Sequence, residues 1–134
     1  MGKPNKSHDS DAADKDFFQR LRRELEHQIA CYEYEVPEGA MGTPLPLKEV
    51  RALVNSMPLW LIEPFWEEVN ICNTPQDSQT GVGVRRMCVT MAEDAGYVLV
   101  FDPVDEEYHL AWRGESGLGT WGIRGDGIEC FIAR

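Results

Sequence analysis

The densest group of residues suited to binding an anion lies in residues 80–86, where two glycines alternate with valines and two adjacent arginines follow. A helix that begins near Gly83 would present free backbone amides beside two guanidinium groups, an arrangement that binds phosphate or sulfate. The alternative is that both arginines face solvent and pair with nearby acids. The candidate anion site consists of Gly81, Gly83, Arg85 and Arg86.

His109 is the second residue that could take part in chemistry, because it follows a run of acids in a segment that alternates like a strand. A histidine beside a thiol can activate it as a nucleophile, and Cys130 could approach His109 across a sheet. The same histidine, with Arg113 and Arg85, could instead supply the polar groups of a pocket between sheet and helices. Nothing in the sequence orients these side chains toward one another.

No metal or cofactor is expected from the remaining motifs. The four cysteines, Cys31, Cys72, Cys88 and Cys130, are 41, 16 and 42 residues apart, which excludes a zinc ribbon or a CxxC redox pair. Each lies among apolar residues, as a buried free cysteine does. The glycines of residues 117–122 match a dinucleotide fingerprint by letter, but strands are expected on both sides where that fingerprint needs a helix.

Aromatic residues are numerous, with four tryptophans, four tyrosines and five phenylalanines in 134 residues. Large aromatics fill cores, and they also dominate the centres of protein interfaces. Trp60 lies between two prolines, so we predict that it anchors an interface, with Trp66 beside it.

The charge excludes some partners. Thirteen basic and twenty-three acidic residues give a net charge of −10, which disfavours attraction to nucleic acids and to anionic membranes. Residues 1–16 are polar and no long apolar run follows, so a cytoplasmic location is expected. A basic protein, or a second copy of the chain, is the expected partner.

Helical periodicity dominates the first part of the chain. An apolar residue recurs every three or four positions between 13 and 33, at Phe18, Leu21, Leu25, Ile29 and Tyr32. A second helix is expected from Thr43 to Met57, closed by Pro58, and a short third one after Pro64. Between 82 and 95 two periods compete, and the helical spacing fits better than the alternation of a strand.

The last forty residues have the patterns of strands. We expect strands over 97–101, 108–112, 120–123 and 128–133, with a hairpin turn at 124–127. Together these elements predict an α+β fold, with N-terminal helices packed on a small C-terminal antiparallel sheet of three to four strands. Residues 1–13 are expected to form a flexible polar tail, and residues 14–134 a single domain.

No assembled catalytic constellation is visible, and the acidic charge and surplus of aromatics favour binding. We therefore predict a non-catalytic protein-interaction or regulatory module. The alternative is a small enzyme or ligand-binding domain with a pocket between sheet and helices.

Overall fold

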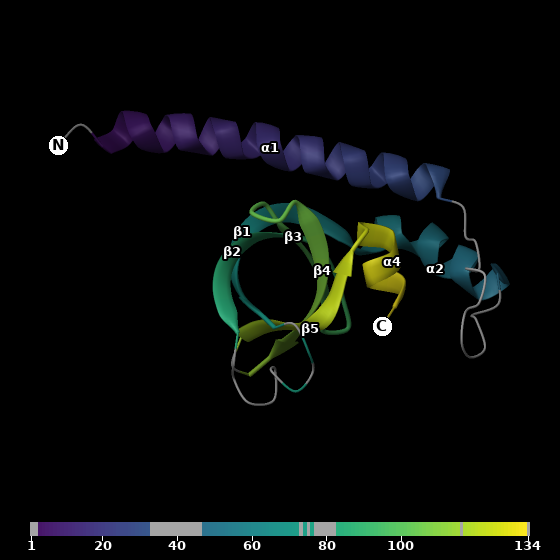
Figure 1. The fold of residues 1–134 in the computed structure, drawn as a ribbon. Helices are drawn as coiled ribbons and strands as arrows, with labels where there is room; N and C mark the ends of the chain where they lie inside the picture. The colour runs from purple at the N-terminus through teal and green to yellow at the C-terminus, as the bar shows by residue number, and fades with distance from the viewer. Residues whose placement is uncertain are drawn as a thin grey trace.

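The computed structural model describes residues 3–32, 47–72, 74, 76, 83–115 and 117–133. Helices and strands follow one another in the order α1 (Lys3–Cys31), α2 (Leu47–Trp60), β1 (Leu61–Ile71), β2 (Val84–Asp94), β3 (Tyr97–Asp102), β4 (Glu107–Gly114), β5 (Gly117–Gly125) and α4 (Gly127–Ile132). The predicted α+β fold is confirmed, with five strands in place of three to four (Figure 1).

The five strands form a closed barrel in the order β1-β2-β3-β4-β5. Each strand is antiparallel to the one before it, and since their number is odd the last pair, β1 with β5, must be parallel. That pair is short, with Val69 opposite Leu118 and Asn70 opposite Gly119. The Thr120 hydroxyl extends this seam, because it accepts from the backbone N–H of Cys72 and donates to its carbonyl.

The strands separate two cores. Inside the barrel lies a smaller cluster made only of strand residues: Val69, Ile71, Cys88, Val98, Val100, Ala111 and Leu118. The larger cluster lies on the outer surface of the barrel, where Leu99 and Leu110 meet residues of all three helices. Alternate residues of one strand therefore serve different cores, as the pleat requires.

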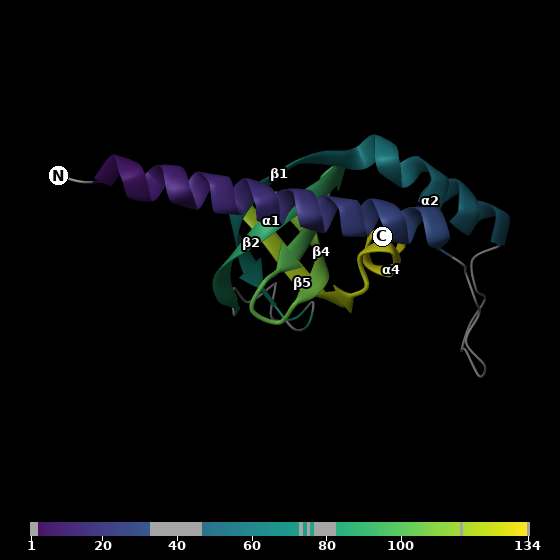
Figure 2. The same cartoon turned by 90° about the horizontal axis from the view of Figure 1, so that it is seen from above.

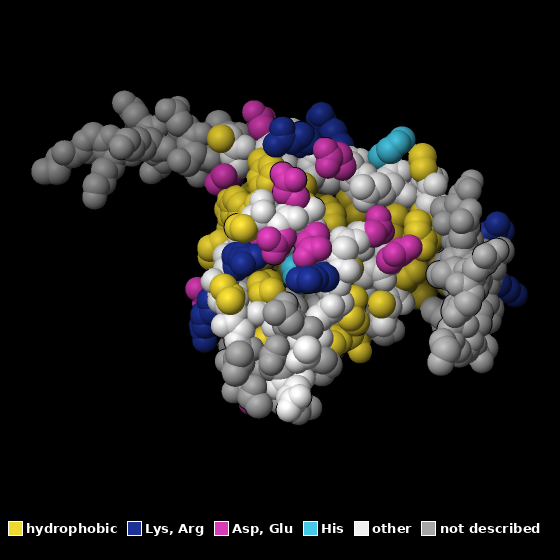
Figure 3. Space-filling view, in the orientation of Figure 1, with side chains coloured by type: hydrophobic (Ala, Val, Ile, Leu, Met, Phe, Trp, Pro, Cys, Tyr) yellow, Lys and Arg dark blue, Asp and Glu magenta, His cyan; other side chains and the backbone are white. Residues whose placement is uncertain are grey.

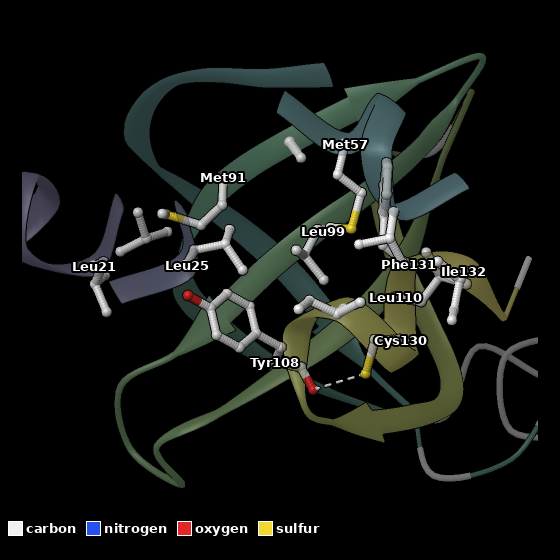
Figure 4. Close-up of a cluster of buried hydrophobic side chains, with 14 of the residues drawn as sticks. Leu21, Leu25, Met57, Met91, Leu99, Tyr108, Leu110, Cys130, Phe131 and Ile132 are labelled. Carbon is white, nitrogen blue, oxygen red and sulfur yellow. Dashed lines mark hydrogen bonds between the residues drawn. The ribbon is translucent and has the colours of Figure 1, made fainter. Parts of the chain in front are cut away.

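The helices cover one side of the barrel. Leu25 of α1, Met57 of α2 and Phe131 of α4 are fully buried against Leu99 and Leu110 (Figure 4). Burying a side chain of this size contributes about 1.5–3 kcal/mol relative to leaving it exposed. The helix α1 crosses the barrel, and its N-terminal end extends beyond the barrel in both ribbon views (Figures 1 and 2).

The short helix predicted after Pro64 is wrong, because this segment is strand β1. Its apolar spacing suits a helix, but Glu67 and Val69 stand opposite Cys88 and Arg86 in the register of β2. Pro64 lies at the irregularity between Leu61 and Phe65, where a missing N–H costs no ladder hydrogen bond.

The helix predicted over 82–95 is also wrong, because residues 84–94 form strand β2. Residues 88–92 are all buried, since both faces of the strand are covered, and this erases the alternation expected of a surface strand. A register shift between Thr90 and Ala92 adds one residue, so the adjacent Met91 and Ala92 both belong to the outer core.

The strand predicted over 128–133 is helix α4, and the predicted hairpin turn before it is a helix start. The Asp126 side chain accepts from the backbone N–H groups of Ile128 and Glu129, which is the arrangement of an N-cap. The alternation of Ile128, Cys130 and Ile132 imitates a strand because α4 is buried on most of its surface.

The other elements were predicted closely. The strands at 97–101, 108–112 and 120–123 are β3, β4 and β5. The first helix begins at Lys3, earlier than the expected position 13, and α2 continues through Pro58 to Trp60. The expected start of α2 at Thr43 lies outside the described residues.

Candidate functional site

A groove of about 620 Å³ lies between α1, the turn that joins β3 to β4, and the junction of β5 with α4. This is a pocket between helices and sheet, as one of the two sequence hypotheses required. Acidic side chains gather on the face of the molecule below α1 (Figure 3). The volume of the groove is in the range of ordinary ligand sites.

Three aromatic rings line the groove: Phe17 of α1, Phe101 of β3 and Tyr108 of β4. The rings of Phe101 and Tyr108 meet edge to face at 5.1 Å, and those of Phe17 and Phe101 at 6.3 Å. The guanidinium carbon of Arg20 lies 5.7 Å from the centre of the Phe17 ring. The chain's own arginine thus already rests on one of these aromatic surfaces.

Three carboxylates also line the groove, each from a different element. Glu24 belongs to α1, Glu106 to the β3–β4 turn, and Asp126 to the start of α4. Within the described ranges, none of these three carboxylates forms a salt bridge. By contrast, three acids of β1 and β2 form salt bridges with arginines: Glu68 with Arg85, and Glu67 and Glu93 with Arg113. The groove therefore has an excess of negative charge that only Arg20 opposes.

Tyr108 is nine-tenths buried, and its hydroxyl points toward α1 (Figure 4). Burial, and then the charges of Glu24 and Asp126, raise the pKa of its phenol, so the hydroxyl stays protonated at neutral pH. Among the described side chains this hydroxyl has no hydrogen-bond partner. It is a polar group available to a ligand in the groove.

The turn that carries Glu106 is fixed by a polar cluster. The fully buried Asp102 accepts a hydrogen bond from Arg86 at 2.5 Å and one from the N–H of Val104 at 2.9 Å. Arg86 also bonds Asp105 at 3.1 Å. Glu106 itself has a φ of 53°, the left-handed region, so this turn holds its backbone in a conformation that few residues adopt.

His109 lies inside the barrel end beneath this turn, and not in the groove. It is 1% exposed, and neither ring nitrogen has a hydrogen-bond partner in the described part of the chain. Its Nε2 is 3.8 Å from Glu107 and 3.9 Å from Asp102. Burial lowers the pKa of the ring, and the two carboxylates only partly offset this effect.

Arg113 lies four residues farther along β4 and has different partners. It makes two hydrogen bonds with Glu67 and one with Glu93, at 2.6–3.0 Å. These contacts lower the pKa of Glu67 and raise that of Arg113. The structure therefore does not bring His109 and Arg113 together in one pocket, and neither lines the groove.

The arginines of the predicted anion site lie on β2, so the helix N-terminus on which that prediction depended is not present there. Arg85 pairs with Glu68 at 2.9 Å on the exposed surface, and Arg86 pairs with Asp102 and Asp105. Gly83 lies just before the strand, close to Asn70 and Cys72, while Gly81 is outside the described residues.

The predicted interface tryptophans are partly buried. The Trp60 ring packs on Phe131 at 5.5 Å, and Trp66 packs on Phe17 and Phe18 of α1. Their part in an interface stays a prediction. Trp112, which the sequence reasoning did not single out, is more exposed and packs edge-on against Tyr97.

The suggested pairing of Cys130 with His109 is wrong. Cys130 lies on α4 against the outer surface of the barrel and donates to the carbonyl of Tyr108, whereas the His109 side chain faces the interior. Burial raises the pKa of the Cys130 and Cys88 thiols to about 12, so neither is a thiolate at neutral pH.

Within the described chain, no group of three or more His, Cys, Asp or Glu side chains is arranged to hold a metal ion. No described helix has the length and apolar character needed to cross a membrane. Comparison with protein-family models, curated proteins and solved structures finds no match.

The residues of the groove are those that the sequence reasoning missed. Phe17 precedes the expected apolar stripe of α1, and Glu24 is not part of that stripe. Asp126 had been placed in a hairpin turn. A signal for it existed, because Asp before an apolar run is a common N-cap.

Proposed function

We propose that this chain is a non-catalytic interaction module that binds a basic protein partner in the groove between α1 and the barrel. The observation that carries the proposal is the set of three carboxylates around an aromatic floor, none of which forms a salt bridge with a described residue. A basic segment could pack its apolar stems on the rings and pair its charges with Glu24, Glu106 and Asp126.

The net charge of −10 supports the same proposal at longer range. A strongly acidic surface speeds the encounter with a basic partner and repels nucleic acids and anionic membranes. All four cysteines are free, which agrees with the reducing conditions of the cytoplasm, where we propose that binding takes place.

The geometry gives less support to the alternative of a small enzyme. His109 is enclosed in the barrel, and the thiols of Cys88 and Cys130 are held in their unreactive form by burial. Neither group borders the groove in which a substrate would have to lie.

The test is the binding of fluorescein-labelled peptides measured by anisotropy. We expect a peptide of alternating lysine, arginine and alanine to bind, with an affinity that falls as salt rises, and a glutamate peptide of equal length not to bind. If no basic peptide binds at low salt, the proposal is overturned.

A matched pair of variants separates the groove from net charge. Replacing the groove acids (Glu24→Gln, Glu106→Gln, Asp126→Asn) and replacing three exposed acids elsewhere (Glu49→Gln, Glu63→Gln, Glu115→Gln) both change the net charge from −10 to −7. Asparagine at 126 retains the capping role. We expect the groove variant to bind about tenfold more weakly or worse, and the control to change by about twofold or less. Equal weakening would overturn the groove as the site.

A further inference from the structure

We infer that the group recognised in the groove is the guanidinium of an arginine in the partner, in preference to the ammonium of a lysine. This inference rests on the proposed function and adds the chemistry of the bound side chain. It is carried by the aromatic floor, by the positions of the acceptors and by the Tyr108 hydroxyl.

The floor suits a flat cation. The rings of Phe17, Phe101 and Tyr108 meet edge to face, so a ligand meets ring faces as well as edges. Guanidinium is planar and weakly hydrated, so it stacks on such rings more readily than a strongly hydrated ammonium does. The contact of Arg20 with Phe17, at 5.7 Å from the guanidinium carbon to the ring centre, is one example of such a pair within the chain.

The acceptors suit a donor that reaches in several directions. Glu24, Glu106 and Asp126 stand on three separate elements around the groove, and Asp126 uses only Oδ1 for the helix cap. Five N–H donors in one plane can address acceptors on different sides at once, whereas an ammonium offers three donors around one point.

Tyr108 supplies an observation independent of the acids. Its side chain is 8% exposed, lines the groove and has a hydroxyl without a hydrogen-bond partner among the described residues. The hydroxyl oxygen is not sealed off as the ring nitrogens of His109 are, so a ligand atom in the groove can reach it and donate or accept. A guanidinium N–H would donate to its oxygen.

The experiment compares four peptides that differ at one central position: arginine, lysine, trimethyl-lysine and citrulline. Citrulline keeps the planar shape of arginine without its charge. Each peptide is titrated into the full chain and followed by two-dimensional NMR. We expect arginine to bind about tenfold more tightly than lysine or trimethyl-lysine, and citrulline to shift no groove resonance at the same concentration.

The outcomes separate the inference from the proposed function. Equal binding of arginine and lysine would overturn the guanidinium preference and leave a general basic site. Tighter binding of trimethyl-lysine would assign the groove to an alkylated ammonium and also overturn the inference. If none of the cationic peptides binds, both the guanidinium preference and the proposed function are overturned.

Tyr108→Phe tests the hydroxyl without changing the packing of the ring. We expect this variant to weaken arginine binding about threefold to tenfold and to affect lysine less, because fewer donors of lysine reach the oxygen. Its thermal unfolding, followed by circular dichroism, shows whether the fold is retained. An unchanged ratio of arginine to lysine affinity would remove Tyr108 from the site.

Discussion

The side-chain hydroxyl of Thr120 and the backbone of Cys72 exchange two hydrogen bonds, at 2.9 and 3.1 Å, beside the parallel pairing of β1 with β5. Both residues are buried, and the backbone ladder at this seam is short. One side chain therefore takes the place of a further pair of ladder hydrogen bonds where the barrel closes.

Thr120→Val tests this closure. The substitution keeps the shape of the side chain and removes the two hydrogen bonds between the hydroxyl and the backbone of Cys72. We expect the free energy of unfolding in urea to fall by about 1–3 kcal/mol, the usual contribution of one or two buried hydrogen bonds. Thr120→Ser, which keeps the hydroxyl, is the control and should lose less. If valine proves as stable as threonine, the seam does not depend on this contact.

His109 predicts a specific dependence of stability on pH. Its pKa is lowered in the folded state, so below the ordinary value of 6.5 the unfolded chain binds more protons than the folded one. Stability is therefore fully present above that pH and decreases as the pH falls toward the folded pKa, by up to about 1.4 kcal/mol per pH unit.

The measurement is urea unfolding at several pH values between 7.5 and 5.5, above the range in which most carboxylates titrate. We expect His109→Leu to flatten the dependence. A wild-type curve that is already flat would contradict the role assigned to the buried ring.

Leu25 tests how α1 is held on the barrel. It is fully buried between α1 and the outer core, so Leu25→Ala leaves a cavity and should cost about 2–5 kcal/mol. Leu59→Ala makes the same chemical change at a side chain that is 83% exposed, and we expect less than about 0.5 kcal/mol from it. Equal losses for the two variants would show that α1 does not depend on this packing.

The cysteines should differ sharply in their reaction with iodoacetamide. Cys31 is exposed on α1, whereas Cys72, Cys88 and Cys130 are buried. Because the thiolate is the reacting species, we expect one rapid modification in the folded protein and four in denaturant, counted by mass spectrometry. Cys31→Ser should abolish the rapid reaction. Rapid labelling of Cys88 or Cys130 in the folded chain would contradict their burial.

The sequence reasoning was most successful where one physical cause determines the pattern. The segments that became β3 and β4 have strong strand patterns, and Leu21 and Leu25 lie on the buried side of α1 as their spacing indicates. The α+β class followed from these segments alone.

It failed where a segment is covered on both faces. In β2, Cys88 faces the inner core and Val89 the outer one, so positions 88–92 are all buried and the period of two disappears there. A helix of the same composition would show a similar pattern, and the choice between them depends on partners distant in the sequence.

The groove could not be found from spacing, since its parts come from three distant places in the chain. Glu24, Glu106 and Asp126 have ordinary surroundings in the sequence, and only the packing of α1 across the barrel brings them to one groove. For His109, which the sequence suggested as a polar group of a pocket or a partner of a thiol, the charged neighbours in the structure are Asp102 and Glu107.

The closed barrel also limits how this chain can meet other proteins. Every strand from β1 to β5 has a paired neighbour on each side, and the shortest of these pairings is the two-residue seam of β1 with β5. Strand addition, a common route both to peptide recognition and to fibrous aggregation, is therefore disfavoured along the other four pairings. There a partner of the barrel must be recognised through side chains, so its specificity resides in surface residues that can change without altering the fold.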